Sequence, residues 1–234
     1  MSMSVGLHAL AGLWFDDADS LAAEQELPEP PNTCQFERYF FSQFGETRPS
    51  VAMLGTASGD ADSDLAAFYR RMSHADCRAT DISVTRYRYT DLEALVDRQD
   101  ILYMGDGSAP NLVAIWRAQG LDALVKNRVS TSRLSLYAEG DSAAALFQAY
   151  DSRATGSLDV HADGLGIFTG SLLRTLSVRE AEAYELPKPI YLVKPRIGIM
   201  FKSASEPYTI ASGDGGNAWR VDYRTRERVP LPAL

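Results

Sequence analysis

A serine that follows an apolar segment is the first candidate for chemistry in this chain. Ser142 lies in the stretch Gly-Asp-Ser-Ala-Ala-Ala of residues 140–145, just after a predicted strand at 134–137. A serine at a strand-to-helix turn can project its hydroxyl above the edge of a sheet and act as a nucleophile. The same serine can instead cap the helix, because its oxygen accepts hydrogen bonds from first-turn N–H groups. The pattern leaves both interpretations open.

A glycine turn is the second candidate element. The apolar residues 101–104 predict a short strand, Gly105 and Gly107 bracket a tight turn, and Pro110 stands where a helix would begin. Such a turn presents backbone N–H groups at the carboxyl edge of a sheet. One of them, together with the N–H of Ala143, would form an oxyanion hole. Alternatively, the two glycines only let the chain reverse between strand and helix.

A serine nucleophile needs a base within hydrogen-bond reach. The chain has three histidines, and His161 is the one that we select as the catalytic candidate, with Asp159 or Asp163 to orient it. Its alternative role is that of a histidine in a surface loop. A dyad of Ser142 with Lys194 is a more remote alternative.

The order of the predicted elements indicates an α/β protein. Strands that alternate with helices favour a parallel sheet flanked by helices, and from residue 187 onward the pattern predicts a β-rich, antiparallel C-terminal part. No linker divides the chain, so we expect a single domain over residues 1–234. Particular expectations are a strand at 82–87, a helix capped by Thr90 with Glu93 completing a capping box, and a helix at 142–150.

Composition restricts the class of partner. The 234 residues carry a formal net charge of -8, which argues against nucleic acid or an anionic membrane as a partner. No apolar run approaches the roughly 20 residues of a membrane span. Cys34 and Cys77 have no metal-ligand spacing, so we expect no metal and no cofactor. We expect a cytoplasmic protein whose ligand is a small molecule or a short peptide, and a homo-oligomer stays open.

Three segments together resemble the peptidase E and cyanophycinase-type serine peptidases. That family has a class I glutamine amidotransferase-like fold, which the resemblance implies here as well. The family's nucleophile turn has the form Gly-x-Ser-Ala-Gly-Ala, so the resemblance implies that Ser142 is the nucleophile, with Ala144 in place of the second glycine. The three segments are Thr-Ala-Ser-Gly-Asp at 56–60, Tyr-Met-Gly-Asp-Gly-Ser at 103–108 continuing to Arg117, and Gly-Asp-Ser-Ala-Ala-Ala-Leu at 140–146.

The chain departs from this family at several positions. The family has a glycine-rich turn ending in Asn where this chain has Asp106 and Ser108. Its histidine follows a Gly-Ser pair in a Pro-His context, whereas residues 170–175 read Gly-Ser-Leu-Leu-Arg-Thr. The family's later acidic turn falls where Lys194 and Arg196 make this chain basic, which suits an anionic ligand or an acidic peptide unless both are only solvated charges.

These departures favour a divergent peptidase E-like serine hydrolase homologue whose catalytic triad is incomplete. Such a protein would be degenerate, or recruited to binding or to altered chemistry. The alternative is an active serine peptidase that hydrolyses short acidic peptides through Ser142. A third interpretation is a noncatalytic subunit of a larger assembly.

Overall fold

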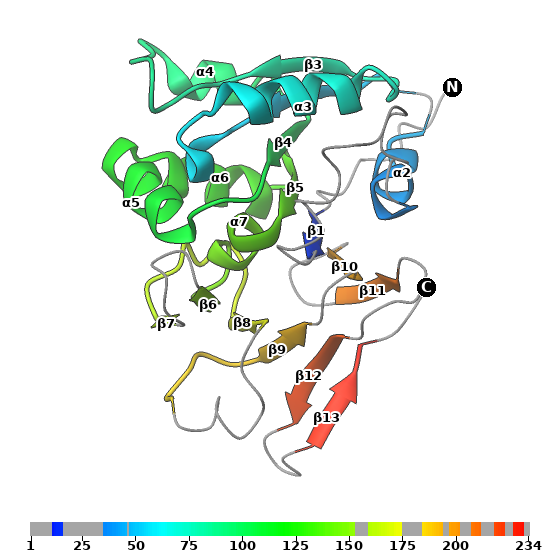
Figure 1. Ribbon diagram of the computed structural model, residues 1–234, viewed down its shortest axis with the longest axis vertical. Coiled ribbons are helices and arrows are strands. Elements are labelled where there is room, and N and C mark those ends of the chain that lie inside the picture. The colour runs from blue at the N-terminus through cyan, green and yellow to red at the C-terminus, as the bar shows by residue number, and fades with distance from the viewer. Residues whose placement is uncertain are drawn as a thin grey trace.

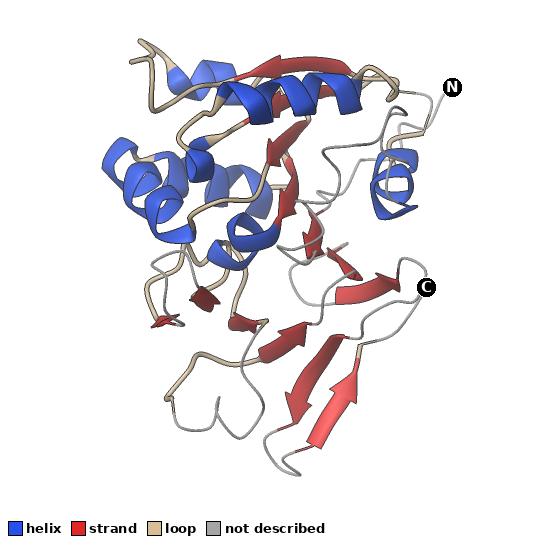
Figure 2. Ribbon diagram, viewed as in Figure 1, coloured by secondary structure: helices blue, strands red, loops and turns tan. Residues whose placement is uncertain are grey.

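The computed structural model has two β-sheets, and every described helix precedes the second sheet along the chain (Figures 1 and 2). The described residues are 11–15, 35–45, 47–152, 159–174, 184–193, 197–201, 207–211, 218–222 and 227–231. The helices are α2 (Gln35–Ser42), α3 (Asp62–Met72), α4 (Leu92–Val96), α5 (Ala109–Gln119), α6 (Leu121–Ser130) and α7 (Gly140–Ala145), with the 3-10 turn η2 (Thr56–Ser58).

The first sheet has seven strands, five of which are parallel. In spatial order they are β11 (Pro207–Ala211), β10 (Ile197–Phe201), β1 (Ala11–Phe15), β5 (Ser135–Glu139), β4 (Ile101–Met104), β2 (Ser50–Met53) and β3 (Arg78–Asp81). The strands from β1 to β3 in this order form parallel pairs, whereas β10 is antiparallel to both of its neighbours, β1 and β11. The parallel sheet is as predicted except for β3, which lies before the strand expected at 82–87, and its parallel strands end at one common edge.

The second sheet has six strands. In spatial order they are β13 (Glu227–Pro230), β12 (Ala218–Asp222), β9 (Ile190–Val193), β8 (Ser171–Leu173), β6 (Ala149–Ser152) and β7 (Asp159–His161). Strands β6, β8 and β9 run parallel, whereas β7, β12 and β13 are antiparallel to their neighbours. The parallel strands of this sheet therefore come from both the middle and the C-terminal part of the chain.

The first sheet is covered by helices on both faces. Along β4, Ile101 and Tyr103 pack in the cluster that contains the side chains of α2 and α3. Leu102 and Met104 point the other way and pack in the cluster that contains α5, α6 and α7. Because successive side chains of a strand point to opposite faces, a strand buried on both sides must be continuously apolar. This explains why residues 101–104 do not alternate between polar and apolar side chains.

Two glycines let helix α2 approach the sheet. A Cβ on Gly198 of β10 would lie 1.9 Å from the Phe36 ring, and one on Gly12 of β1 would lie 2.6 Å from the Phe40 ring. Both phenylalanines are fully buried. The absent side chains on β1 and β10 therefore make the space that the aromatic face of α2 fills.

An arginine connects α2 and α3 to the end of β5. The Arg71 guanidinium binds the buried carboxylate of Glu37, and its Nη2 lies 2.9 Å from Oε1 of Glu139. It also lies 5.5 Å from the centre of the Tyr103 ring, where the aromatic face attracts a cation. Glu139 is the last residue of β5, so this network fixes the strand end from which α7 begins.

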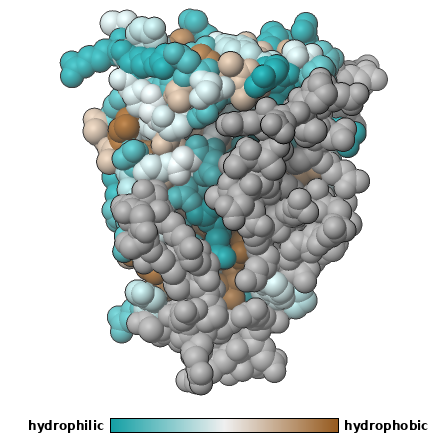
Figure 3. All heavy atoms as spheres, viewed as in Figure 1, coloured by the Kyte–Doolittle hydropathy of each residue, from teal (hydrophilic) through white to brown (hydrophobic). Residues whose placement is uncertain are grey.

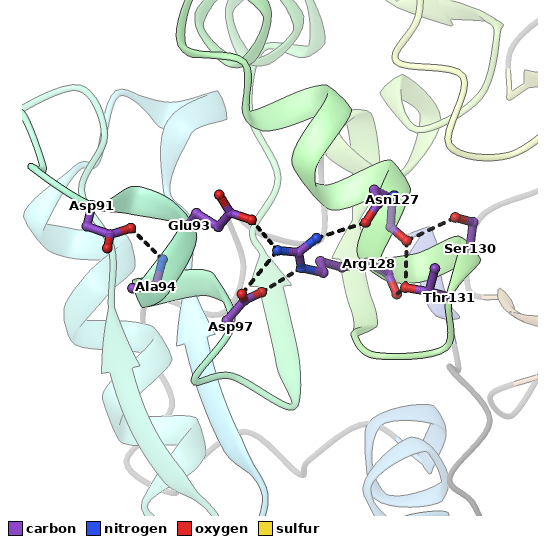
Figure 4. Close-up of polar contacts among 8 residues, drawn as sticks. All are labelled: Asp91, Glu93, Ala94, Asp97, Asn127, Arg128, Ser130 and Thr131. Carbon is purple, nitrogen blue, oxygen red and sulfur yellow. Dashed lines mark hydrogen bonds and ion pairs between the residues drawn. The ribbon is translucent and has the colours of Figure 1, made fainter.

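Helix α4 begins at a different cap from the one expected. Oδ1 of Asp91, and not the Thr90 hydroxyl, accepts a hydrogen bond of 2.8 Å from the Ala94 N–H (Figure 4). Glu93 does not complete a capping box with Thr90 because its carboxylate binds Arg128 of α6 (Figure 4). A tertiary ion pair thus replaces the predicted local hydrogen bond of Glu93.

The prediction of a strand at 82–87 is wrong, because β3 ends at Asp81 and a loop follows. The Thr85 N–H donates to Oδ2 of Asp60 at 2.9 Å, and the Ser83 N–H donates to the Tyr89 hydroxyl at 2.9 Å. Side chains therefore bind the backbone groups that a further ladder would need.

The C-terminal part is β-rich as predicted, but its strands do not form one antiparallel series. Strand β10 joins the first sheet beside β1, whereas β9 pairs in parallel with β8. The helix predicted at 142–150 is also shorter, since α7 ends at Ala145 and β6 begins at Ala149. Pairing of Ala149 with Ser171 of β8 overrides the helix propensity of the alanine-rich segment.

The described surface in Figure 3 is mostly hydrophilic, with scattered hydrophobic residues. The large hydrophobic side chains that the described part exposes are those of Tyr69, Tyr87 and Tyr184. Within the same part, no helix has both the length and the apolar composition that crossing a membrane requires.

The contact between Gly198 and Phe36 gives a test of this packing. We expect Gly198→Ala to lower the free energy of unfolding by about 1–3 kcal/mol, because the added methyl group overpacks the interface with α2. Phe36→Leu in the same chain should recover part of that loss, although Phe36→Leu alone is destabilising. Urea unfolding of the four proteins measures both effects. Costs that simply add would contradict a steric contact between the two positions.

Candidate active site of a strand-turn-helix edge

Three turns meet at the carboxyl edge of the parallel sheet. They follow β2, β4 and β5, and this edge is where α/β proteins form their sites. The Ser108 N–H donates to the Ala57 carbonyl oxygen at 2.9 Å, which joins the turn after β4 to the turn after β2. Gly107 has φ +152°, and a Cβ there would lie 2.6 Å from the Ala57 carbonyl carbon. Only glycine permits this approach of two backbones.

Ser142 lies beside the predicted glycine turn. It is the third residue of α7 and is fully buried, and its Oγ donates a hydrogen bond of 2.6 Å to the Gly105 carbonyl oxygen. A carbonyl oxygen orients the hydroxyl but cannot accept its proton as a base. Ala143, the next residue, has its side chain in the core.

The sharp turn between β5 and α7 is at Gly140 and not at Ser142. Gly140 has φ +52°, a conformation that residues with a Cβ rarely adopt. In a nucleophile elbow the nucleophile itself stands at the sharp turn between strand and helix. That position carries no side chain here, and Ser142 lies two residues further along, in the first turn of the helix.

The Asp106 carboxylate fills the space beside Gly140. A Cβ on Gly140 would lie 2.1 Å from Cγ of Asp106. Oδ1 of Asp106 accepts hydrogen bonds from the Gly107 N–H at 2.8 Å and from the Asp141 N–H at 2.6 Å. Burial raises the pKa of Asp106, against the opposing effects of the Gly107 N–H and the positive charge of Arg174. The carboxylate therefore bridges the turn after β4 and the start of α7.

An arginine stands on the other side of the same cluster. The Arg174 guanidinium binds Oδ1 of Asp141, whose Oδ2 accepts a hydrogen bond from the Ser152 hydroxyl. The backbone N–H of Arg174 donates to Oδ1 of Asp151 at 2.8 Å. Burial lowers the pKa of Arg174, but an arginine keeps its charge in proteins. The cluster thus combines three carboxylates with one permanent cation.

His161 lies at the edge of the second sheet. Its ring stacks on Tyr150, with 5.0 Å between ring centres and 15° between planes, and its Nε2 is buried. Within the described ranges no hydrogen bond or ion pair joins His161 to Ser142. Its candidate partner Asp163 instead lies 3.6 Å from Nη1 of Arg117. Lys194 and Arg196 lie outside the described residues.

The sequence patterns indicate no role for Asp141, Arg174 or Ser152. Two signals pointed toward this cluster: Asp106 replaces a residue of the family's glycine-rich turn, and Arg174 lies in the segment where the family has its histidine. Neither signal predicts that the two charges meet. Across the residues that the structure describes, no group of three or more His, Cys, Asp or Glu side chains could hold a metal ion.

Comparison with known proteins places the chain in a family. Residues 21–176 match the sequence model of Peptidase family S51. The chain belongs to this family. Over 96 residues it is 29% identical to an uncharacterized peptidase, YgaJ, of Bacillus subtilis (strain 168), and this match spans 41% of the chain and 42% of that relative.

Solved structures support the fold of this S51 member. A peptidase from an acI-B1 Actinobacterium aligns with a TM-score of 0.64 and 12% identity over 97% of this chain and 96% of the other. A protein named peptidase E from Listeria monocytogenes EGD-e aligns with a TM-score of 0.60 and 14% identity. This match covers 88% of this chain and 100% of the other. The class I glutamine amidotransferase-like fold that the sequence implied is therefore confirmed.

The space beside Gly140 can be tested by substitution. We expect Gly140→Ala to cost about 2–5 kcal/mol of unfolding free energy, from the positive φ and from the clash with Asp106. The control is Gly120→Ala, at φ +69° with nothing within 4 Å, which should cost only about 1–2 kcal/mol. Asp106→Gly should remove the difference between them, as measured by urea unfolding. If Gly140→Ala and Gly120→Ala lowered the free energy of unfolding equally in the chain that keeps Asp106, the clash with Asp106 would be contradicted.

The raised pKa of Asp106 predicts a pH dependence of stability. In the folded state the Asp106 carboxyl group stays protonated to a higher pH than in the unfolded chain, where it titrates near 3.8. The stabilisation is therefore complete below that value and is lost as the pH rises through the folded pKa. We expect Asp106→Asn to flatten this part of the stability profile as the pH rises above about 4, measured by urea unfolding.

Asp97 provides the control for this titration. The hydrogen bond from Arg128 lowers the pKa of Asp97, so its contribution is lost as the pH falls. Asp97→Asn should change the profile in the opposite sense. An unchanged profile in Asp106→Asn would show that Asp106 titrates as it does in the unfolded chain.

Proposed function

We propose that this S51 member is a peptidase homologue with an incomplete catalytic triad, and that it binds a ligand at the ancestral site without hydrolysing it. The observation that carries the proposal is the glycine at the sharp turn after β5, with the Asp106 carboxylate in the space that a nucleophile would need. A turn without a hydroxyl cannot form an acyl-enzyme from that position.

The surroundings of Ser142 support the same proposal. Its hydroxyl is fully buried and donates to a carbonyl oxygen, and a serine acts as a nucleophile only when a base takes its proton. Arg174 stands in the segment where the family has its histidine. A guanidinium remains protonated and cannot replace an imidazole as a base.

The ligand class that we propose is a small anionic molecule or a short acidic peptide. Arg174 provides a permanent positive charge in the cluster. The Gly107 N–H in the turn after β4 already binds a carboxylate, that of Asp106, so this turn suits negatively charged groups. Lys194 and Arg196 are further basic residues of the sequence that suit such a ligand. Negative charge elsewhere on the chain does not exclude this class, since the local arrangement of charges sets the potential of a site.

The second candidate function is an active serine hydrolase that cleaves short acidic peptides through Ser142. The 2.6 Å hydrogen bond that holds Ser142 against the glycine turn favours it, because this turn carries N–H donors. Catalysis would require the hydroxyl to leave the Gly105 oxygen and to meet a base.

Hydrolysis of an Asp-X dipeptide separates the two functions. We expect no turnover above background for the unmodified chain or for Ser142→Ala, because the Ser142 hydroxyl donates to the Gly105 carbonyl oxygen, which is not a base. Ser130→Ala, at the exposed end of α6, is the control for a serine that is remote from the site. Titration calorimetry on the same samples should detect binding of the dipeptide that weakens with salt. Turnover that falls at least about 1000-fold in Ser142→Ala would instead establish the second candidate.

A further inference from the structure

Strand β3 forms an edge of the first sheet. It is the last strand in the order of that sheet, and within the described residues it pairs with β2 alone (Figure 1). The N–H groups of Arg78 and Ile82 donate to carbonyl oxygens of residues 49–53 at 2.8 and 2.9 Å. Because successive residues of a strand direct their backbone groups to opposite sides, the N–H and C=O groups of Ala79 and Asp81 point away from β2.

Local hydrogen bonds limit this free edge to two residues. The N–H of Cys77 donates within the preceding turn at 2.9 Å, and the N–H of Ser83 donates to the Tyr89 hydroxyl at 2.9 Å. Between these positions, the N–H groups of Ala79 and Asp81 have no acceptor among the residues that the structure describes. Each of the two residues therefore offers one backbone donor and one backbone acceptor.

The charged side chains of β3 are bound to neighbouring elements of the same chain. Nε and Nη2 of Arg78 donate to the Ser50 hydroxyl of β2 at 3.1 and 2.9 Å. Oδ1 of Asp81 accepts a hydrogen bond of 2.7 Å from the Tyr69 hydroxyl of α3. Natural edge strands are commonly protected from pairing by charged side chains or by proline. Here the two charges are engaged elsewhere, and β3 contains no proline.

Exposed aromatic side chains belong to the elements around this edge. Tyr69, which binds Asp81, is 39% exposed, and Tyr87 in the loop after β3 is 62% exposed. The described part of the chain exposes one further large hydrophobic side chain, that of Tyr184. Tyrosine is enriched at protein–protein interfaces, because its ring can be buried while its hydroxyl stays hydrogen-bonded. The surroundings of β3 thus have the side chains of an interface.

We propose that β3 pairs in antiparallel orientation with β3 of a second copy of this chain, so that the first sheets of the two copies join. Ala79 then lies opposite Asp81 of the second copy, and the two Thr80 residues face each other on the twofold axis as a favourable cross-strand pair. Opposite residues of a hydrogen-bonded antiparallel pair exchange both bonds, so all the free donors and acceptors are satisfied. The twofold axis closes the assembly at a dimer. This surface lies outside the candidate site, and the inference does not depend on the proposed function.

Groups that are already bound exclude the neighbouring registers. A pairing centred on Ala79 would need the N–H of Cys77, which is bound in its own turn. A pairing centred on Asp81 would place the two Asp81 carboxylates directly opposite each other, where like charges repel. It would also need the N–H of Ser83, which donates to Tyr89. A second copy in the proposed register is therefore the occupant whose backbone groups match this edge.

Ala79→Pro tests the edge and leaves the pairing with β2 in place. It removes an N–H that points toward the second copy, and proline is tolerated where the N–H side of an edge strand faces outward. We expect the unmodified chain to sediment as a dimer, and Ala79→Pro to raise the dissociation constant of the dimer at least about tenfold. Ala79→Ser, which keeps the N–H, is the matched control and should sediment like the unmodified chain.

Two sedimentation results would overturn the proposal. One is an unmodified chain that is monomeric at every concentration, which would leave the edge to a different partner. The other is an Ala79→Pro chain that is folded by circular dichroism and dimerises as tightly as Ala79→Ser.

Thr80 reports the register and decides the question alone if Ala79→Pro does not fold. The Cα atoms of a non-hydrogen-bonded antiparallel pair are about 4.5 Å apart, which a disulfide can span. We expect oxidised Thr80→Cys to form a covalent dimer on a non-reducing gel. Arg78→Cys, which would face Ile82 of the second copy, is the matched control and should not be linked. Equal yields of covalent dimer from the two variants would rule out the proposed pairing.

Discussion

The hydrogen bonds of the Asp106 carboxylate are the interaction on which the arrangement of the site depends. They join the turn after β4 to the start of α7 through the N–H groups of Gly107 and Asp141. Because the carboxylate occupies the space beside Gly140, the turn after β5 must lack a side chain. A positive φ at Gly140 then costs little, and α7 can begin directly at the strand end.

The rest of the fold holds these turns at a fixed separation. A sheet buried on both faces sets the ends of β2, β4 and β5, since neither helical layer can move without exposing apolar side chains. Arg71 reinforces one of these ends by binding Glu139, the residue before Gly140. The second sheet contributes Arg174, whose guanidinium meets Asp141 from the end of β8. The cluster therefore needs both sheets.

The membership of family S51 explains the fold and leaves the chemistry open. The relatives that share the fold are 12% and 14% identical in sequence, a level at which the backbone architecture persists while individual side chains change. The turns at this edge of the sheet can therefore carry a hydroxyl group, a base or a cluster of charged side chains without a change of fold. The Asp106, Asp141 and Arg174 cluster is the variant that this chain carries.

The sequence by itself determined four of the five parallel strands and the glycine turn, because these depend on local apolar runs and on glycine conformations. The position of Ser142 beside that turn followed from the family resemblance, since the contact joins residues 37 positions apart. The sequence also identified the family from three short segments. Only the tertiary structure decided that Gly140 forms the sharp turn, that Asp106 fills the adjoining space, and that Arg174 approaches Asp141 across 33 positions of the chain. The physical reason is that these features arise from contacts between turns distant in sequence, which no local pattern of residues encodes.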